Sequence, residues 1–250
     1  MGFMDYFNKE KGEERKIAKL KKTATHMYVQ AAERQFAIQQ LRDVGTPEAI
    51  RAMLARFNEN APNTTTDAEE KEYTYHLLVE LTKTSALNIP EIIIESLHKS
   101  EEKVNWRLRV LSDVLGYEEM ARVVEELLAG CTTDYQRNPE KKQELILRAA
   151  EFKSDELARQ VLRFLDDDNE TLRFLAVDSA VAQQRDAMVE EPLKRRLVEE
   201  DSLRIVQKLA EIFADRPQWT FGADEREPLG KTLPAGYALH KDGYVYRTRK

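Results

Sequence analysis

One hydrophobic pattern occurs twice in the chain, in DDDNETLRFLAVDSAV and again in EEDSLRIVQKLAEIF, both between Asp166 and Phe213. Each copy opens with acidic residues, continues with Leu-Arg, and then places apolar or small residues at steps of three and four. This spacing lays one apolar face along an α-helix. In the first copy the face contains Leu175, Ala176, Ser179 and Ala180, and in the second Leu203, Val206, Ala210 and Phe213. We therefore expect an amphipathic helix in each copy.

The acidic residues predict where these helices begin. Asp168, Asn169 and Asp201 are good acceptors for the unpaired N–H groups of a first turn, and their charge suits the positive end of the helix dipole. The small residues on the first face, Ala176, Ser179 and Ala180, would let a neighbouring helix approach closely.

Looser copies of the pattern run upstream, and short polar breaks such as Thr46-Pro47 and Ser154-Asp155 start a second helix after most of them. Gly45 should end its helix in a left-handed conformation. Paired helices at a period of roughly 30–40 residues indicate helical repeats. The expected pairs occupy residues 31–57, 73–97, 106–128, 140–165 and 170–198, the last interrupted early by Pro192, and an unpaired helix at 202–213 follows; loops are expected at 58–67 and 130–139.

The segments DDDNETLRFLAVDSAV and QFAIQQLRDVGTPEAIRAMLARF resemble HEAT-like repeats of the phycobilisome-lyase type. These repeats carry acidic residues, a hydrophobic-Arg pair, alanines, a turn and an "EA" helix. The resemblance covers residues 31–215, strongly in the first and last units and loosely between them. It implies an all-α fold, an α-solenoid or superhelix of about five helix pairs, and a family that contains scaffolds, adaptors and a few enzymes.

Three regions are expected: a basic N-terminal helix or extension at 1–30, the HEAT-like α-solenoid at 31–216, and an irregular connector with a β-hairpin at 217–250. The connector is inferred from its prolines and glycines. In the hairpin, Asp242-Gly243 suits a two-residue type I′ turn, which would pair Leu239 with Tyr246 and Lys241 with Tyr244. The hairpin would either cap the last helix or dock a partner.

The N-terminal segment allows two interpretations. Its first residues include Phe3, Met4, Tyr6 and Phe7, and seven Lys or Arg residues follow between Lys9 and Lys22. An aromatic end with a basic helix can lie on an anionic membrane surface, so residues 1–22 would make a peripheral adaptor. Alternatively, the basic residues form the solvated face of a first helix.

Composition narrows the class of protein. The chain has 250 residues, of which 42% are hydrophobic, and this suffices for a continuous core. Its formal net charge of −6 argues against a dedicated nucleic-acid binder. Its one cysteine, Cys131, excludes an intrachain disulfide and fits a reducing cytoplasm. No stretch is long and apolar enough for a membrane span.

The sequence offers no motif for catalysis, a cofactor or a metal. His26, His76, His98 and His240 are scattered, and no phosphate-binding Gly loop or GxSxG motif is present. The enzyme alternatives, a bilin lyase or a helical-repeat DNA glycosylase, would require Trp106 or several tyrosines to share a concave pocket with Asp113 and Arg148.

Two groups of charged residues follow from the repeats. Arg109, Arg173 and Arg204 recur at one position and should pair with acids of the adjacent repeat, or else form a basic track for an acidic partner. The second helices of a curved solenoid commonly present the concave, partner-binding face. Candidates on that face are Arg51, Glu95, Arg122, Glu126, Arg159, Arg163 and Arg195. The sequence thus predicts a non-enzymatic, cytoplasmic scaffold or adaptor of bacterial style that binds another protein there.

Overall fold

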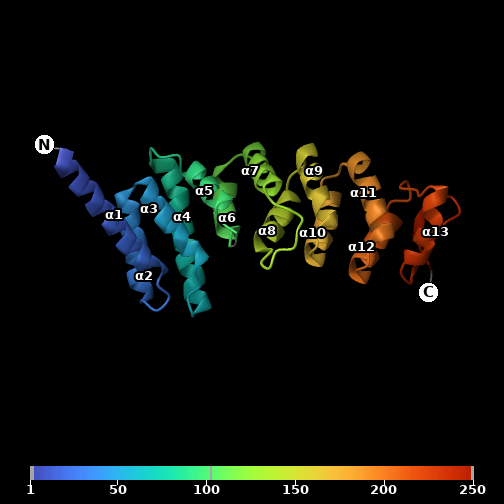
Figure 1. The fold of residues 1–250 in the computed structure, drawn as a ribbon, viewed down its shortest axis with the longest axis horizontal. Helices are drawn as coiled ribbons and strands as arrows, with labels where there is room; N and C mark the ends of the chain where they lie inside the picture. Colours follow the sequence, from blue (N-terminus) through green and yellow to red (C-terminus); the bar gives the residue numbers. More distant parts are fainter. Residues whose placement is uncertain (1–2, 102, 249–250) are drawn as a thin grey trace. The chain divides into compact units, whose positions relative to one another are not determined.

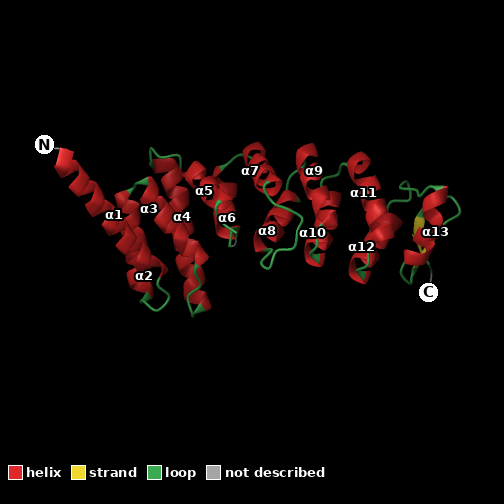
Figure 2. Ribbon diagram, viewed as in Figure 1, coloured by secondary structure: helices red, strands yellow, loops and turns green. Residues whose placement is uncertain are grey.

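The computed structural model describes residues 3–101 and 103–248, with side chains from residue 11 onward in those ranges. The structure is all-α apart from one small two-stranded antiparallel sheet (Figure 2). None of the described helices is both long and apolar enough to cross a membrane. The chain divides into two compact units, Met1–Met120 and Ala121–Lys250, which are described in turn.

The first unit consists of paired helices behind a long N-terminal helix. It contains α1 (Phe3–Thr25), α2 (Ala31–Val44), α3 (Pro47–Leu54), the 3₁₀ turn η1 (Ala55–Asn58), α4 (Thr64–Thr84), α5 (Ile89–His98), α6 (Asn105–Val114) and the start of α7 (Tyr117–Ala129). Helices α2, α4 and α6 pack side by side, α3 packs against α5, and α1 covers α2 and α3 (Figure 1). First and second helices therefore form two layers in this unit.

The second unit repeats this arrangement. After the rest of α7 come α8 (Glu140–Ala149), α9 (Asp155–Arg163), the 3₁₀ turn η2 (Phe164–Asp166), α10 (Glu170–Ala182), α11 (Asp186–Glu199), α12 (Leu203–Ala214), α13 (Ala223–Thr232), β1 (Tyr237–Leu239) and β2 (Val245–Arg247). Helix α10 lies between α8 and α12, α9 packs against α11, and β2 packs on α12. The hairpin thus covers the last helix of the layered pairs, one of its two predicted roles.

Local sequence explains several helix boundaries. The Thr46 side chain accepts a hydrogen bond from the Ala49 N–H at the start of α3, and Ser154 accepts one from Leu157 at the start of α9. Gly45 has φ +65° and donates its N–H to the Leu41 carbonyl, which confirms the left-handed cap after α2.

The two predicted apolar faces form part of the core, except that Leu175 is only partly buried and Leu203 is exposed. Ala176, Ser179 and Ala180 are buried, as expected for a tightly packed first helix. Leu203 and Phe36, by contrast, are 80% and 60% exposed. Leu203 is the first residue of α12, where Ile205, Val206 and Leu209 already supply the buried face. The prediction that Leu203 belongs to the core was therefore wrong.

Helix α4 begins earlier than predicted. Residues 64–67 were expected in a loop, but the Asn63 side chain accepts a hydrogen bond from the Thr66 N–H and α4 starts at Thr64. The polar first turns are buried by ion pairs rather than by apolar contacts: Arg56 contacts Asp67 at 2.6 Å and Glu70 at 3.0 Å, and Arg34 contacts Glu70 at 2.6 Å. A hydrophobic pattern cannot reveal such a helix.

Two further predictions about the C-terminal half were wrong. Helix α11 runs without interruption through Pro192, although an interior proline removes a backbone hydrogen bond and disfavours the helix. The expected irregular connector contains α13, whose first turn is fixed by a hydrogen bond from the Gly222 N–H to the Glu225 side chain. Leu229 of α13 is buried.

The hairpin register differs by one residue from the prediction. Leu239 pairs with Val245, and Ala238 pairs with Tyr246. The loop is longer than the predicted two residues: the His240 N–H donates to the Tyr244 carbonyl, and Gly243 has φ +94°. A longer hairpin loop with a left-handed glycine replaces the type I′ turn. Val245 consequently faces the core, while Tyr246 remains partly exposed.

Candidate functional site

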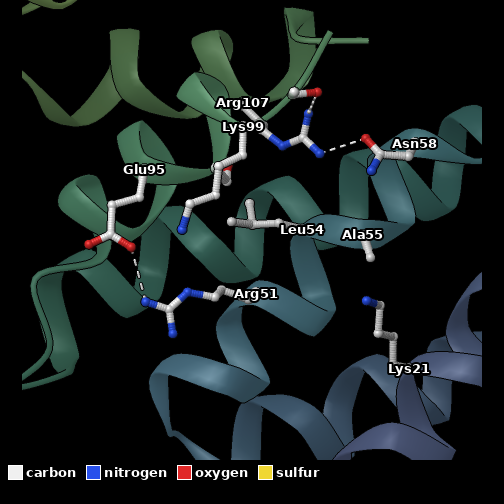
Figure 3. A pocket seen from close by; sticks show the side chains of 10 residues that line it. Lys21, Arg51, Leu54, Ala55, Asn58, Glu95, Lys99 and Arg107 are labelled. Carbon is white, nitrogen blue, oxygen red and sulfur yellow. Dashed lines mark hydrogen bonds and ion pairs between the residues drawn. The ribbon is translucent and has the colours of Figure 1, made fainter. Parts of the chain in front are cut away.

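A pocket of about 250 Å³ opens on the second-helix layer of the first unit (Figure 3). Leu54 of α3 and Ala55 of η1 lie at its centre, and charged side chains surround them. A second hollow shares part of its lining, including Asn58 and Lys99. The pocket is lined by Lys21, Arg51, Leu54, Ala55, Asn58, Glu95, Ser96, Lys99, Ser100 and Arg107.

Four helices supply its charges. Lys21 follows the buried Ile17 by four residues and precedes the buried Ala24 by three, so it lies on the face of α1 that packs toward α2 and α3. Lys99 lies at the C-terminal end of α5, and Arg107 lies in the first turn of α6. Arg51 comes from α3.

Arg107 is the unusual group in this pocket. Its side chain is buried, with 3% of the residue exposed. The guanidinium donates to the Asn58 side-chain oxygen at 2.5 Å, the Lys103 carbonyl at 3.3 Å and the Ser100 hydroxyl at 3.4 Å. Its Nε has no hydrogen-bond partner, and no carboxylate among the described residues pairs with it. Burial lowers the pKa of Arg107 because desolvation disfavours its charge.

The opposite side of the pocket contains a compensated pair. Arg51 lies 3.1 Å from Glu95 of the next second helix and 3.2 Å from Glu48 of its own helix. The structure therefore brings together two of the predicted partner-binding residues, Arg51 and Glu95, on adjacent second helices.

The other predicted partner-binding residues are all exposed on second helices. Arg122 and Glu126 lie one turn apart on α7. Arg159 pairs with Glu156 of its own helix, whereas Arg163 donates to the Cys131 carbonyl at 2.8 Å. Arg195 lies 2.7 Å from Asp166. Intramolecular contacts therefore hold Arg159, Arg163 and Arg195 in place. Because acidic residues lie among these arginines, the exposed face carries charges of both signs.

The three arginines at the repeated position pair with acids of a neighbouring helix pair. Arg109 forms two hydrogen bonds with Glu72, at 2.5 and 2.8 Å. Arg173 lies 2.9 Å from the buried Glu200, and Arg204 lies 3.5 Å from Glu170. Of the two alternatives, these contacts agree with pairing between repeats.

The predicted capping roles of two aspartates were wrong. Asn169 caps α10, while Asp168 accepts a hydrogen bond from the Tyr135 N–H and fixes the preceding loop. Asp201 points into solvent beside Arg173, and the N–H groups of Asp201 and Ser202 both donate to Glu200. An acidic residue close to a helix start therefore need not be the one that accepts hydrogen bonds from the N–H groups of the first turn.

The aromatic cluster of the enzyme alternatives is only partly assembled. Trp106 stacks on Phe57 with ring centroids 5.8 Å apart, and the Tyr75 hydroxyl donates to Asp113. Arg109 lies over the rings of Trp106 and Tyr75, at 5.1 and 4.2 Å from their centroids. Arg148 belongs to the second unit and pairs with Glu151.

The described residues contain no group of three or more His, Cys, Asp or Glu arranged to hold a metal ion. Cys131 is buried and its thiol donates to the Leu127 carbonyl. The aromatic and first basic residues of the proposed membrane segment, Phe3 to Lys9, have side chains outside the described ones.

Sequence reasoning missed the pocket residues Lys21, Asn58, Lys99 and Arg107. A signal for Arg107 did exist. A basic residue stands in the first turns of three first helices, namely Arg34, Arg107 and Lys142, and all three are buried. The Leu-Arg pattern instead points to Arg109, which directly follows Leu108.

Comparisons with protein-family models, with curated proteins and with solved structures each found no match to this chain.

Proposed function

We propose that this chain is a non-enzymatic protein-binding scaffold, an α-solenoid of HEAT-like pairs that binds a partner through its second-helix face. The supporting observation is the layering within each unit, where α2, α4 and α6 adjoin and α3 adjoins α5, and where α8, α10 and α12 adjoin and α9 adjoins α11. Stacked pairs present long surfaces suited to protein partners.

The charges on second helices favour a protein partner over nucleic acid. Arg51 and Glu95 alternate on the α3–α5 surface. On α7, burial and the nearby negative charges of Glu156 and Glu126 raise the pKa of Glu125. A phosphate backbone would favour a uniformly basic surface. A mosaic of both signs suits the polar rim of a protein interface.

Site-specific photo-crosslinking in the native cells would test this role. A benzophenone side chain at His98, exposed on α5, should crosslink a partner protein. The same group at Phe36, exposed on α2, serves as the control for the first-helix layer. Equal crosslinking from both positions, or none from His98, would contradict the proposed face.

Once crosslinking has identified the partner, charge reversal provides a second test of the binding face. Arg51→Glu should weaken binding about tenfold or more, because it breaks a pair on the proposed face and adds repulsion there. Arg42→Glu is a matched control: Arg42 is similarly exposed and also pairs with a glutamate, Glu80 at 2.7 Å, but from α2. A larger effect of Arg42→Glu would assign binding to the other layer.

A further inference from the structure

Other shielded cations on first helices can be compared with Arg107. Arg34 lies 2.6 Å from Glu70, Lys142 lies 2.9 Å from Asp167, and Arg173 lies 2.9 Å from Glu200. Each of these shielded cations therefore has a carboxylate partner. The hydrogen bond to Glu70 raises the pKa of Arg34, whereas burial lowers that of Arg107.

Arg107 is a buried cation whose partners among the described residues are all neutral. A buried charge without a counter-charge is costly, and the cost is removed when an anion binds next to it. Arg107 lines an open pocket, so an anion bound there would lie beside the guanidinium and supply the missing counter-charge.

Two further cations face the same pocket. Lys21 and Lys99 approach it from α1 and α5, and neither forms an ion pair with a described residue. The Asn58 side-chain oxygen already accepts from Arg107, so its amide nitrogen remains as a donor. Glu95, the one acid among the described lining residues, is compensated by Arg51 at 3.1 Å.

We propose that this pocket binds a phosphate monoester, held by Arg107, Lys21 and Lys99. Donors that converge from three helices suit a tetrahedral group with three terminal oxygens better than a planar carboxylate with two. The dianion would neutralise most of the excess positive charge of the lining. If the scaffold function holds, the monoester is a phosphorylated side chain of the partner, and only this assignment rests on the proposed function.

Titration of the full chain with O-phosphoserine, at constant ionic strength, tests the site. The ¹⁵N-labelled side-chain Nε–H signal of Arg107 should shift, because this group has no acceptor in the free protein. Acetate at the same concentration should not reproduce the shift. No saturable shift with O-phosphoserine, or an equal affinity for acetate, would overturn the proposal.

Matched variants distinguish specific binding in the pocket from a general effect of the chain's positive charge. Lys21→Ala with Lys99→Ala, both exposed residues, should keep the fold and weaken O-phosphoserine binding at least tenfold, since charge-assisted hydrogen bonds are lost. Lys22→Ala with Lys83→Ala removes the same charge from exposed positions outside both hollows and is the control. Equal affinity of the two double variants would contradict the assignment. Arg107→Gln should abolish saturable binding.

The source of the phosphate is distinguished by a second probe. A phosphoserine peptide that binds at least tenfold more tightly than O-phosphoserine indicates a partner protein, whereas equal affinities indicate a small phosphorylated molecule. Both results support the site. Failure of the crosslinking at His98 would leave O-phosphoserine binding unaffected, so the two proposals fail independently.

Discussion

Glu200 shows how one buried carboxylate can join two helices. Its side chain is shielded from solvent and lies 2.9 Å from Arg173 of α10 and 3.1 Å from Arg196 of α11. Burial alone would raise its pKa, but the hydrogen bonds from Arg173 and from the Ser202 N–H, with the charge of Arg196, lower it to about 2. The ionised form is therefore strongly favoured in the folded state.

This pKa predicts a loss of stability in acid. The folded pKa of about 2 lies below the ordinary value of 4.5, so the stabilisation is complete above pH 4.5 and is lost as the pH falls toward 2. Between pH 6 and pH 3, Glu200 should account for about 2 kcal/mol of lost unfolding free energy. Urea denaturation of the wild type and of Glu200→Gln measures it, and the variant should have the flatter profile. Parallel profiles would contradict the assignment.

Gly243 is a position where both the backbone conformation and the surrounding atoms disfavour a side chain. Its φ is +94°, and an added Cβ would stand 2.5 Å from the Phe221 carbonyl oxygen and 2.8 Å from an Arg226 nitrogen. Gly243→Ala should therefore cost both conformational strain and a clash, in total about 2–4 kcal/mol. Thermal or urea unfolding gives the measurement.

Substitutions at two other glycines distinguish the cost of conformational strain from the cost of the clash. Gly236 has φ +93° but nothing within 4 Å of its Cβ position, so Gly236→Ala should cost only the strain, about 1 kcal/mol. Gly230 has open space inside α13, and Gly230→Ala should stabilise by about 0.5–1 kcal/mol. A cost at Gly243 no larger than at Gly236 would show that the hairpin shifts freely away from Phe221.

At the scale of elements, ion pairs fix α8 to the segment before α10. Lys142 of α8 is 1% exposed and donates to the Asp167 carboxylate and the Asp134 carbonyl, both at 2.9 Å. The other Asp167 oxygen accepts from the Asn169 N–H at the start of α10. One buried pair therefore sets the position of a helix, a loop and the next helix.

Removal of one partner should be expensive. Lys142→Met leaves Asp167 buried without a counter-charge and should cost about 3–5 kcal/mol. The exposed pair Lys231–Glu227 on α13, 2.9 Å apart, is the control, and Lys231→Met should change stability by less than about 0.5 kcal/mol. Chemical denaturation of both variants provides the comparison, and similar losses in the two would contradict the role assigned to burial.

The same elements show what a sequence can and cannot predict. Helices with an apolar stripe, such as α10, were placed correctly because the period of Leu172, Ala176 and Ala180 is a local property. The first turn of α4 was missed because Asp67 and Glu70 are buried by Arg56, 11 and 14 residues away. Spacing along the chain does not reveal such pairings.

The pocket illustrates this limit most clearly. Arg51 and Glu95 could be predicted as neighbours, since both occupy the exposed face of a second helix. Arg107 could be recognised as a basic residue at the start of a first helix, but its place in a pocket could not be predicted, because that depends on Asn58, 49 residues away, and on the lack of a described carboxylate beside it. The hairpin register failed for a related reason: the contact between Phe221 and Gly243 favours the longer loop.

At the scale of the whole molecule, the proposed stack of helix pairs makes a prediction about how stability is shared. In a solenoid each pair contacts only its neighbours, so a local loss of stability should remain local. Lys142→Met provides the perturbation, since it weakens the α8–α10 contact in the second unit. Amide hydrogen exchange should accelerate by about a hundredfold or more in α8 and α10, as a loss of about 3 kcal/mol requires.

Helices α2 and α4 are the internal reference, because their core and the buried Arg34–Glu70 pair belong to the first unit. Their exchange should stay unchanged in the Lys142→Met variant under the same mild denaturant. Lys231→Met, which leaves no buried charge, should alter neither region. If α2 and α4 lost protection together with α8 and α10, the chain would unfold as one cooperative body, and an array of nearest-neighbour repeats would be the wrong description of it.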